Sequence, residues 1–212
     1  MTVEPTSAPL LGEPLPIELM NTIWADRTGV HDALATRPEV LAWLRAVGPR
    51  LEMRAPRVAG WLNATRPSAM AETATELRRL RDALRALTAV RVADPRPDAV
   101  SLVADRHTAV EVLNRVAAMS PSWPGLDWQD RAEPIRTARF AGPAGPAIAS
   151  LLAAEFCELV GEGNRPQLRA CLAPGCVLYF AKVHHRREWC STACGNRARA
   201  ARHYRRRAAH SQ

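Results

Sequence analysis

The segment Cys171-Leu172-Ala173-Pro174-Gly175-Cys176, followed after thirteen residues by Cys190-Ser191-Thr192-Ala193-Cys194, decides the fold of the C-terminal part of this 212-residue chain. Its four thiols come in two close pairs, which is the usual donor set of one tetrahedral Zn²⁺. A Pro-Gly turn bends the first pair so that both sulfurs can face the same ion. We therefore predict one structural zinc, held by Cys171, Cys176, Cys190 and Cys194.

The second cysteine pair lies at the start of an expected helix. Ser191 is well placed to cap a helix that begins just after Cys190, and Cys194 then falls in its first turn. The partial positive charge of a helix N-terminus also favours thiolates at that place. Residues 177–180 indicate a short strand, followed by a polar turn. This order predicts a small treble-clef-like finger that ends in a helix.

Four cysteines complete the tetrahedron, so the predicted zinc has no open position for catalysis and acts as a scaffold. A mononuclear iron or an iron–sulfur centre is the alternative metal group. His184 and His185 could each replace a cysteine as ligand, but we interpret them as turn residues because four sulfurs suffice. Cys157 falls on an apolar segment before the finger, and we interpret it as a small buried hydrophobe.

Positive charge is concentrated in the same part of the chain. Residues 165–212 contain eleven basic residues and one acidic residue, a net charge of +10, whereas the remainder has 18 basic and 20 acidic residues, a net charge of −2. A basic end on a nearly neutral body is typical of nucleic-acid-binding proteins. A solvated, solubilising tail is the alternative interpretation.

The basic residues of the tail favour one helical face. If Ser191 caps the helix, steps of 100° place four polar side chains together: Arg199, Arg202, His203 and Arg206. Arginines presented in this way suit phosphate contacts and bidentate contacts with guanine. The residues that we expect at a nucleic-acid interface are Arg197, Arg199, Arg202, Arg206 and Asn196 of the helix, with Arg186 and Arg187 of the preceding turn.

Several side chains of the finger have two interpretations. Asn196 could bind backbone groups around the zinc site, which we favour, or an adenine edge. Arg197 could brace the hairpin or reach a phosphate. The aromatic side chains could stack on unpaired bases, but we favour a role as the miniature core of the finger; they are Tyr179, Phe180 and Trp189.

Residues 1–163 are expected to form a mainly helical domain, and residues 164–212 the finger. The hydrophobic content of 47% supports a real core. The clearest helix covers 69–92, where leucines recur at three- and four-residue steps before Asp94-Pro95. Further helices are predicted from a Thr36 cap to Gly48, over 98–119 and over 147–160, with a hairpin of residues 126–128 and 135–140 and a turn at 142–146. The predicted fold class is mainly α, with a minor α+β part.

Other functional classes find little support in the sequence. It contains no HExxH, GxSxG or P-loop motif, so we expect no enzyme; Asn21 and Thr22, which we interpret as helix-bracing residues, are those that a catalytic role would involve. The N-terminus lacks the pattern of a signal peptide, and no run approaches the ~18 apolar residues of a membrane span. We therefore expect a cytoplasmic protein without a membrane partner. In that reducing compartment, paired cysteines more often bind metal than form disulfides.

The run Cys194-Gly195-Asn196-Arg197, with the Cys-x4-Cys pair before it and the Arg/Ala-rich tail after it, resembles the CGNR zinc finger. The rest of the chain is similar to the ABATE domain, on the basis of residues 19–22, Trp43 and Leu113-Asn114. The resemblance implies a bacterial, stress-related transcription regulator that binds DNA through the finger. The chain has three residues between the last two cysteines, where many family members have four.

These observations lead to one favoured function and to alternatives. We expect a DNA-binding transcription regulator, in which the finger holds DNA and the helical domain senses a signal or forms a homodimer. An RNA-binding protein that stacks single-stranded bases is one alternative, and a zinc-dependent protein-interaction module is another. The recognised DNA sequence and any small-molecule signal cannot be read from the sequence.

Overall fold

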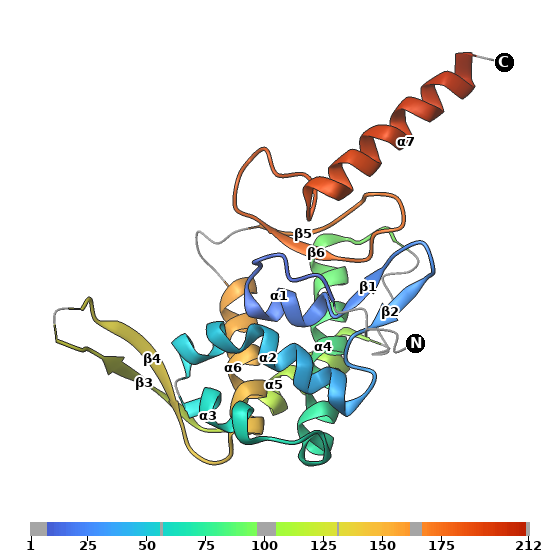
Figure 1. Ribbon diagram of the computed structural model, residues 1–212. Helices are drawn as coiled ribbons and strands as arrows, with labels where there is room; N and C mark the ends of the chain where they lie inside the picture. The colour runs from blue at the N-terminus through green and yellow to red at the C-terminus, as the bar shows by residue number, and fades with distance from the viewer. Residues whose placement is uncertain (1–7, 56, 97–104, 131, 162–166, 211–212) are drawn as a thin grey trace.

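The computed structural model describes residues 8–55, 57–96, 105–130, 132–161 and 167–210, and it confirms the predicted mainly helical fold with short hairpins and a C-terminal finger (Figure 1). The helices before the finger are α1 (Leu15–Met20), α2 (Arg37–Arg54), α3 (Arg57–Ala64), the short 3-10 helix η1 (Pro67–Met70), α4 (Ala71–Val92), α5 (Arg106–Ala117) and α6 (Ala144–Val160). No helix of the described residues is long and apolar enough to cross a membrane.

Helix α4 lies at the centre of the core. Its leucines recur every three or four residues, so that Leu77, Leu80 and Leu84 are fully buried on one face. Helices α1, α5 and α6 pack against it. Helix α6 approaches α4 closely at Gly145, because a Cβ at that position would collide with the hydroxyl of Thr73. The glycine therefore permits the contact between the two helices.

Local sequence signals define the helix starts. Thr36 forms a capping box with Glu39 at the start of α2, as its position in the sequence predicts. Helix α5 begins at Arg106, where Asp105 caps it through Thr108, and the expected residues 98–104 lie outside the described residues. Helix α6 begins at Ala144, so Gly145 and Pro146 belong to its first turn and not to the separate turn that was expected at 142–146. Proline is tolerated there, because the backbone N–H groups of the first turn have no partner within the helix.

Three antiparallel hairpins complete the fold: β1 (Ile23–Ala25) with β2 (Val30–Asp32), β3 (Ser122–Asp127) with β4 (Ile135–Phe140), and β5 (Gln167–Ala170) with β6 (Tyr179–Lys182). The first of these was not expected from the sequence. In the third, β5 was not expected either, and the strand expected over residues 177–180 lies at Tyr179–Lys182. The β3–β4 pair is longer than expected, with six paired positions from Ser122↔Phe140 to Asp127↔Ile135. It projects from the body of the molecule as an arm (Figure 1).

The finger is joined to the core of the helical part. Tyr179 and Ala181 of β6 belong to the same buried apolar cluster as α1, α2, α4 and α6. A second, small cluster inside the finger contains the four cysteines, Phe180 and Ala198, with Trp24 of β1 packed on it. Helix α7 (Thr192–His210) starts at this second cluster and extends away from the rest of the molecule (Figure 1).

Candidate metal centre and basic helix

The four predicted cysteines meet at one point. Their Sγ atoms all lie within 4.8 Å of one another, and all four residues are buried. Neighbouring sulfurs are 3.8 Å apart for Cys176 and Cys190 and 3.4 Å apart for Cys190 and Cys194. Four sulfurs at ~2.3 Å from a tetrahedral Zn²⁺ would be roughly 3.8 Å apart, so the donor set fits one zinc. The site is a closed structural zinc site.

Local contacts place the ligands as the sequence predicts. The Ser191 hydroxyl accepts a hydrogen bond from the backbone N–H of Cys194 at 3.2 Å, which caps α7. Gly175 adopts a φ of 70° in the turn between the first two ligands, a conformation that side-chain-bearing residues rarely adopt. The backbone N–H of Cys190 points at the sulfur of Cys171 at 3.5 Å. These contacts orient the sulfurs toward a common centre.

The sulfur cluster carries shifted proton affinities. Hydrogen bonds from Cys176 and Cys190 hold the pKa of Cys171 far below its usual value. The same contact with Cys171, together with burial, raises the pKa of Cys176 and Cys190. A thiophilic metal that binds the four sulfurs as thiolates displaces the protons that they still carry.

Arg197, on α7, brings a positive charge next to the zinc ligands. The guanidinium of Arg197 donates a hydrogen bond to the sulfur of Cys194 at 3.2 Å. Four thiolates around one Zn²⁺ leave two excess negative charges, which a neighbouring guanidinium partly offsets. Arg197 thus acts at the metal site, a role outside the two that its sequence position suggested.

A second guanidinium, that of Arg96, comes from the helical part and binds the knuckle, the segment of residues 171–178 that carries the first two ligands. Nη1 of Arg96 donates hydrogen bonds to the carbonyls of Cys171, Cys176 and Leu178 at 3.0 to 3.2 Å. The remaining nitrogens of Arg96 pair with Asp94, which is itself almost fully buried. These bonds of Arg96 hold the pKa of Asp94 below its ordinary value, although burial alone would raise it. The carboxylate therefore stays charged and fixes the arginine.

Strand β6 is held to α1 and α4 by further buried polar groups. The side-chain amide of Asn21 donates to the carbonyl of Tyr179 at 3.0 Å and accepts from its N–H at 2.9 Å. Arg85, fully buried, donates to the carbonyls of Met20 and Val177. The guanidinium groups of Arg85 and Arg96 both lie about 5 Å from the Tyr179 ring. Asn21 and Thr22, which hydrogen-bonds to Leu19, are buried bracing residues.

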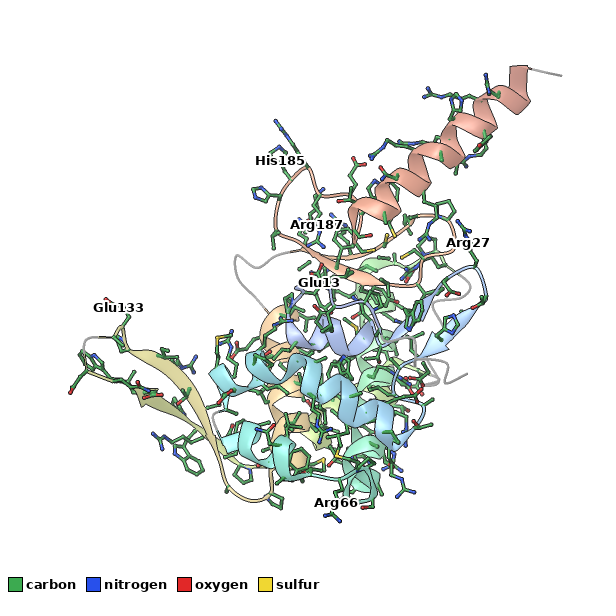
Figure 2. All side chains as sticks on the ribbon, in the orientation of Figure 1. Glu13, Arg27, Arg66, Glu133, His185 and Arg187 are labelled. Carbon is green, nitrogen blue, oxygen red and sulfur yellow. The ribbon has the colours of Figure 1, made fainter. Side chains whose placement is uncertain are left out.

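Arg187, one of the residues expected to contact nucleic acid, is used inside the protein. Its guanidinium donates to the carbonyls of Ala181, Trp189 and Cys190 and to the carboxylate of Glu13 (Figure 2). The other carboxylate oxygen of Glu13 accepts from the N–H of Ala181 at 2.9 Å. We therefore leave Arg187 out of the proposed interface, because its donors are already engaged.

The other expected interface residues are exposed. Arg186 lies on the turn after β6, and Arg199, Arg202 and Arg206 lie along α7. Asn196, which we favoured as a partner of backbone groups near the zinc, is instead exposed and accepts a hydrogen bond from Arg199. His184 and His185 are exposed on the turn and lie outside the cysteine cluster, and Figure 2 shows His185 pointing away from the body. Cys157 is exposed rather than buried.

Sequence reasoning missed a groove between the knuckle and α7. Its walls are Leu172 and Pro174 of the knuckle on one side and α7 on the other, with Trp189 beside them, and its volume is about 430 Å³. Arg202 and Arg205 line the same groove, although Arg205 was not among the expected contacts. Helical steps relate Arg205 to Ala198 and Ala201, whose apolar side chains face the finger, and this signal could have identified it.

Phe180 and Trp189 belong to the small core of the finger, as favoured, whereas Tyr179 belongs to the main core of the helical part. Tyr179 and Phe180 are buried, in the main cluster and the finger cluster respectively. Trp189 is half-buried and packs on the finger cluster, where a Cβ at Gly195 would lie 3.1 Å from its ring. Glycine at this position lets the indole lie close to the start of α7.

Comparison with known protein families places both parts of the chain. The family model ABATE, described as "Putative stress-induced transcription regulator", matches residues 13–163. The model of the CGNR zinc finger matches residues 167–207. No curated protein matches the chain.

Proposed function

The chain belongs to the ABATE family and carries a CGNR zinc finger, and on that premise we propose that it regulates transcription by holding duplex DNA against helix α7. The observation that carries the proposal is the form of α7. It is a 19-residue helix that has no acidic residue, starts at the zinc site and extends away from the body (Figure 1). A helix of this width fits the major groove of B-DNA.

The exposed arginines supply the contacts. Arg199, Arg202 and Arg206 lie one helical turn apart in succession, which suits phosphates along one groove wall. Arg202 and Arg205 border the groove beside the knuckle, where an apolar wall meets a cationic rim. A sugar–phosphate segment combines the same two properties. We propose that the knuckle seats on the DNA backbone while α7 enters the neighbouring groove.

The zinc site supports this role by fixing the helix. It is assisted by the buried clamp, which consists of Arg96, its partner Asp94 and their contacts with the knuckle. The first turn of α7 carries Cys194, and the knuckle is hydrogen-bonded to Arg96 of the helical part. A recognition helix that is held rigidly loses little conformational entropy on binding. The RNA alternative is weaker, because Tyr179 and Phe180 are buried and cannot stack on bases.

The test is selection of duplex DNA from a random pool by the purified, zinc-loaded protein, followed by sequencing. We expect an enriched motif and a dependence of log K on log salt with a slope of about −4 to −5, since ~4–6 phosphates are neutralised. Cys190→Ser should abolish enrichment. Arg202→Gln with Arg206→Gln should weaken binding across all sequences and make the slope shallower by about 2.

The matched control is Arg106→Gln with Arg115→Gln, which removes the same charge from exposed positions of α5. It should leave the affinity within about twofold. A flat salt response, or equal losses in the two double variants, would count against the proposal. Preferential binding of single strands in competition would favour RNA. Sequence-independent, weak binding together with a stable protein complex would favour the interaction module.

A further inference from the structure

A cavity of about 410 Å³ lies at the base of the arm, between β4, the first turn of α6 and the start of α3 (Figure 1). Its volume falls within the roughly 300–1,000 Å³ of small-molecule sites. Part of the lining is apolar and consists of Ala55, Val58 and Ala147. The strands of the arm contribute polar groups to the rest. An apolar lining with a few polar groups is the usual form of a site for a small organic molecule.

Thr137 contributes an unused hydroxyl to this cavity. The residue is only 7% exposed, and its hydroxyl forms no hydrogen bond with any other described residue. The hydroxyl oxygen still has accessible surface. Because side chains alternate between the faces of a strand, Thr137 shares its face of the hairpin with Arg139 and Asp127, which also line the cavity. A buried polar group without a partner in the protein is available to a ligand.

Arg139 brings a positive charge to the same side of the cavity. A Cβ at Gly125 would lie 2.5 Å from Nε of Arg139 and 2.9 Å from the hydroxyl oxygen of Thr137, so both groups lie against this glycine. Glycine thus leaves room for the arginine to lie across the hairpin. Arg139 forms no ion pair or hydrogen bond with any other described residue, and its donors are available.

The first turn of α6 adds backbone donors. Ala144 lines the cavity, and Pro143 before it provides no side-chain cap for the helix. The N–H groups of Ala144 and Gly145 therefore have no hydrogen-bond partner among the described residues. The N-terminus of a helix of 17 residues carries a partial positive charge that favours anions. A guanidinium, a buried hydroxyl and a helix N-terminus consequently surround one cavity.

Asp127 restricts what the cavity can hold. Its carboxylate accepts hydrogen bonds and repels a second anionic group. Asp127 pairs with Ile135, which lies four residues before Arg139 on β4, or ~13 Å along the strand. Asp127 forms no ion pair with any other described residue. A ligand that satisfies both groups is anionic at one end and carries hydrogen-bond donors at the other.

We propose that this cavity binds a small phosphate monoester that carries hydroxyl groups, as a sugar phosphate does. The phosphate accepts hydrogen bonds from Arg139, from the Thr137 hydroxyl and from the first N–H groups of α6, while a hydroxyl donates to Asp127. Phosphate suits these donors better than carboxylate, because its three terminal oxygens can meet donors from several directions. The proposal is independent of DNA binding, and so is its test.

Amide chemical shifts of the ¹⁵N-labelled, zinc-loaded full chain test the proposal at constant ionic strength. The probes are inorganic phosphate, glycerol 3-phosphate, ribose 5-phosphate and glucose 6-phosphate. We expect the amide signals of Gly142, Ala144 and Gly145 to shift, with a Kd on the order of 5 mM for inorganic phosphate and about tenfold tighter for at least one ester. Acetate and glucose should bind at least fivefold more weakly than phosphate. Phosphate bound along α7 is distinguished, because it shifts other signals.

Each donor is removed by a conservative variant. Arg139→Gln should weaken phosphate binding at least tenfold, whereas Arg136→Gln removes the same charge from the opposite face of β4 and should change it less than twofold. Thr137→Val removes only the hydroxyl, and should weaken binding about threefold without lowering the melting temperature. Ala144→Pro deletes one N–H where a helix tolerates proline, after a residue with a suitable ψ of 151°, and should have a similar effect.

Asp127→Asn tests the other end of the ligand. It should strengthen the binding of inorganic phosphate about twofold, because it removes a repulsion, and it should reduce the preference for the ester. Melting temperature and zinc content verify that each variant is folded. The proposal is overturned if phosphate up to 20 mM shifts none of the α6 signals, or if acetate binds as well as phosphate. Equal losses in Arg139→Gln and Arg136→Gln, or no ester preferred to inorganic phosphate, would overturn it too.

Discussion

At the scale of single residues, Arg96 is the side chain on which the metal site depends most. One of its nitrogens bonds three carbonyls of the knuckle, and the others neutralise the buried Asp94. Arg96→Ala leaves a buried carboxylate unpaired and the carbonyls unsatisfied, so we expect a loss of about 3–5 kcal/mol in the free energy of unfolding. Zinc transfer to a chromogenic chelator should become faster at the same time.

Arg96→Lys separates charge from geometry at this site. Lysine keeps the charge but lacks the planar fork, so it should restore part of the stability and leave zinc transfer fast. Arg91→Ala, an exposed residue near the end of α4, should stay within about 0.5 kcal/mol of the wild type. Equal zinc release from the Arg96→Ala and Arg91→Ala variants would show that the clamp does not support the knuckle.

A second residue-scale prediction concerns pH and Glu18. Burial raises the pKa of its carboxyl, although backbone N–H groups of Leu11 and Glu13 and the charge of Arg50 oppose the shift. Because the folded-state pKa exceeds the unfolded one, this group's contribution to stability is complete below pH ~4.5 and decreases as pH rises through the folded pKa. Glu18→Gln removes that titration.

The Glu18→Gln variant should therefore gain stability relative to the wild type as pH rises from 4.5 to 7.5, by about 1.4 kcal/mol for each unit of pKa shift. Urea unfolding at four pH values measures the difference, in which the pH dependence of zinc binding cancels. Glu52→Gln makes the same substitution at an exposed position of α2 and is the control for the substitution itself. A Glu18→Gln difference that does not change with pH would contradict the prediction.

The ligands themselves were predictable, whereas their supports were not. The roles of the four cysteines and of the capping serine can be inferred from short-range spacing in the sequence. Arg96 contacts carbonyls 75 to 82 positions away, and Glu13 contacts Arg187 at a separation of 174. No local pattern marks an arginine or a glutamate for such a contact. Arg187 shows the consequence, because its charge suggested DNA while its geometry assigns it to the finger.

At the scale of elements, the contact between α4 and α6 depends on Gly145. Alanine is the better helix former by up to ~1 kcal/mol, so open space at this position would make Gly145→Ala stabilising. The Thr73 hydroxyl occupies that space, however, and we expect the substitution to destabilise the protein by about 1–3 kcal/mol instead. Thermal unfolding of the variant measures the sign.

A double-mutant cycle isolates the cause. Thr73→Ala removes the obstructing atoms, so Gly145→Ala in that background should be neutral or stabilising, and the coupling between the two changes should exceed about 1 kcal/mol. Gly60→Ala, on α3 where no atom lies within 4 Å of the added Cβ, is the matched control. If the cost of Gly145→Ala were the same with and without Thr73, helix approach would not be its origin.

Among the elements, α4 followed from its leucine spacing, whereas α2 continues past its expected end at Gly48 to Arg54. The arm followed in part from its β-branched and aromatic residues. The β1–β2 hairpin did not, because strands of three residues are too short to show an alternating pattern. Trp24 of β1 packs on the finger cluster, so this hairpin is stabilised by residues more than a hundred positions later. The groove beside α7 could not be predicted for a similar reason, because its walls come from two separate segments, the knuckle and α7.

At the scale of the whole molecule, zinc should stabilise more than the finger. Tyr179 and Ala181 belong to the main core, and Asn21, Arg85, Arg96 and Glu13 all bond to the finger from the helical part. Removal of zinc by a strong chelator frees the knuckle carbonyls and strand β6 together. We expect a single unfolding transition that shifts downward by about 10 °C, since each kcal/mol changes the midpoint of a chain of this size by ~2–4 °C.

Calorimetry with and without chelator measures the shift, and hydrogen exchange locates it. Amides of α1 and the C-terminal part of α4 should lose protection on zinc removal, because Asn21 at the end of α1 and Arg85 of α4 hydrogen-bond to the finger. Cys171→Ser with Cys176→Ser should reproduce the chelated state, whereas Cys157→Ser, outside the cluster, should melt as the wild type does. Two separate transitions, with an unchanged upper one, would instead mean that the finger folds by itself and that the buried clamp transmits none of the metal's stabilisation to the helical part.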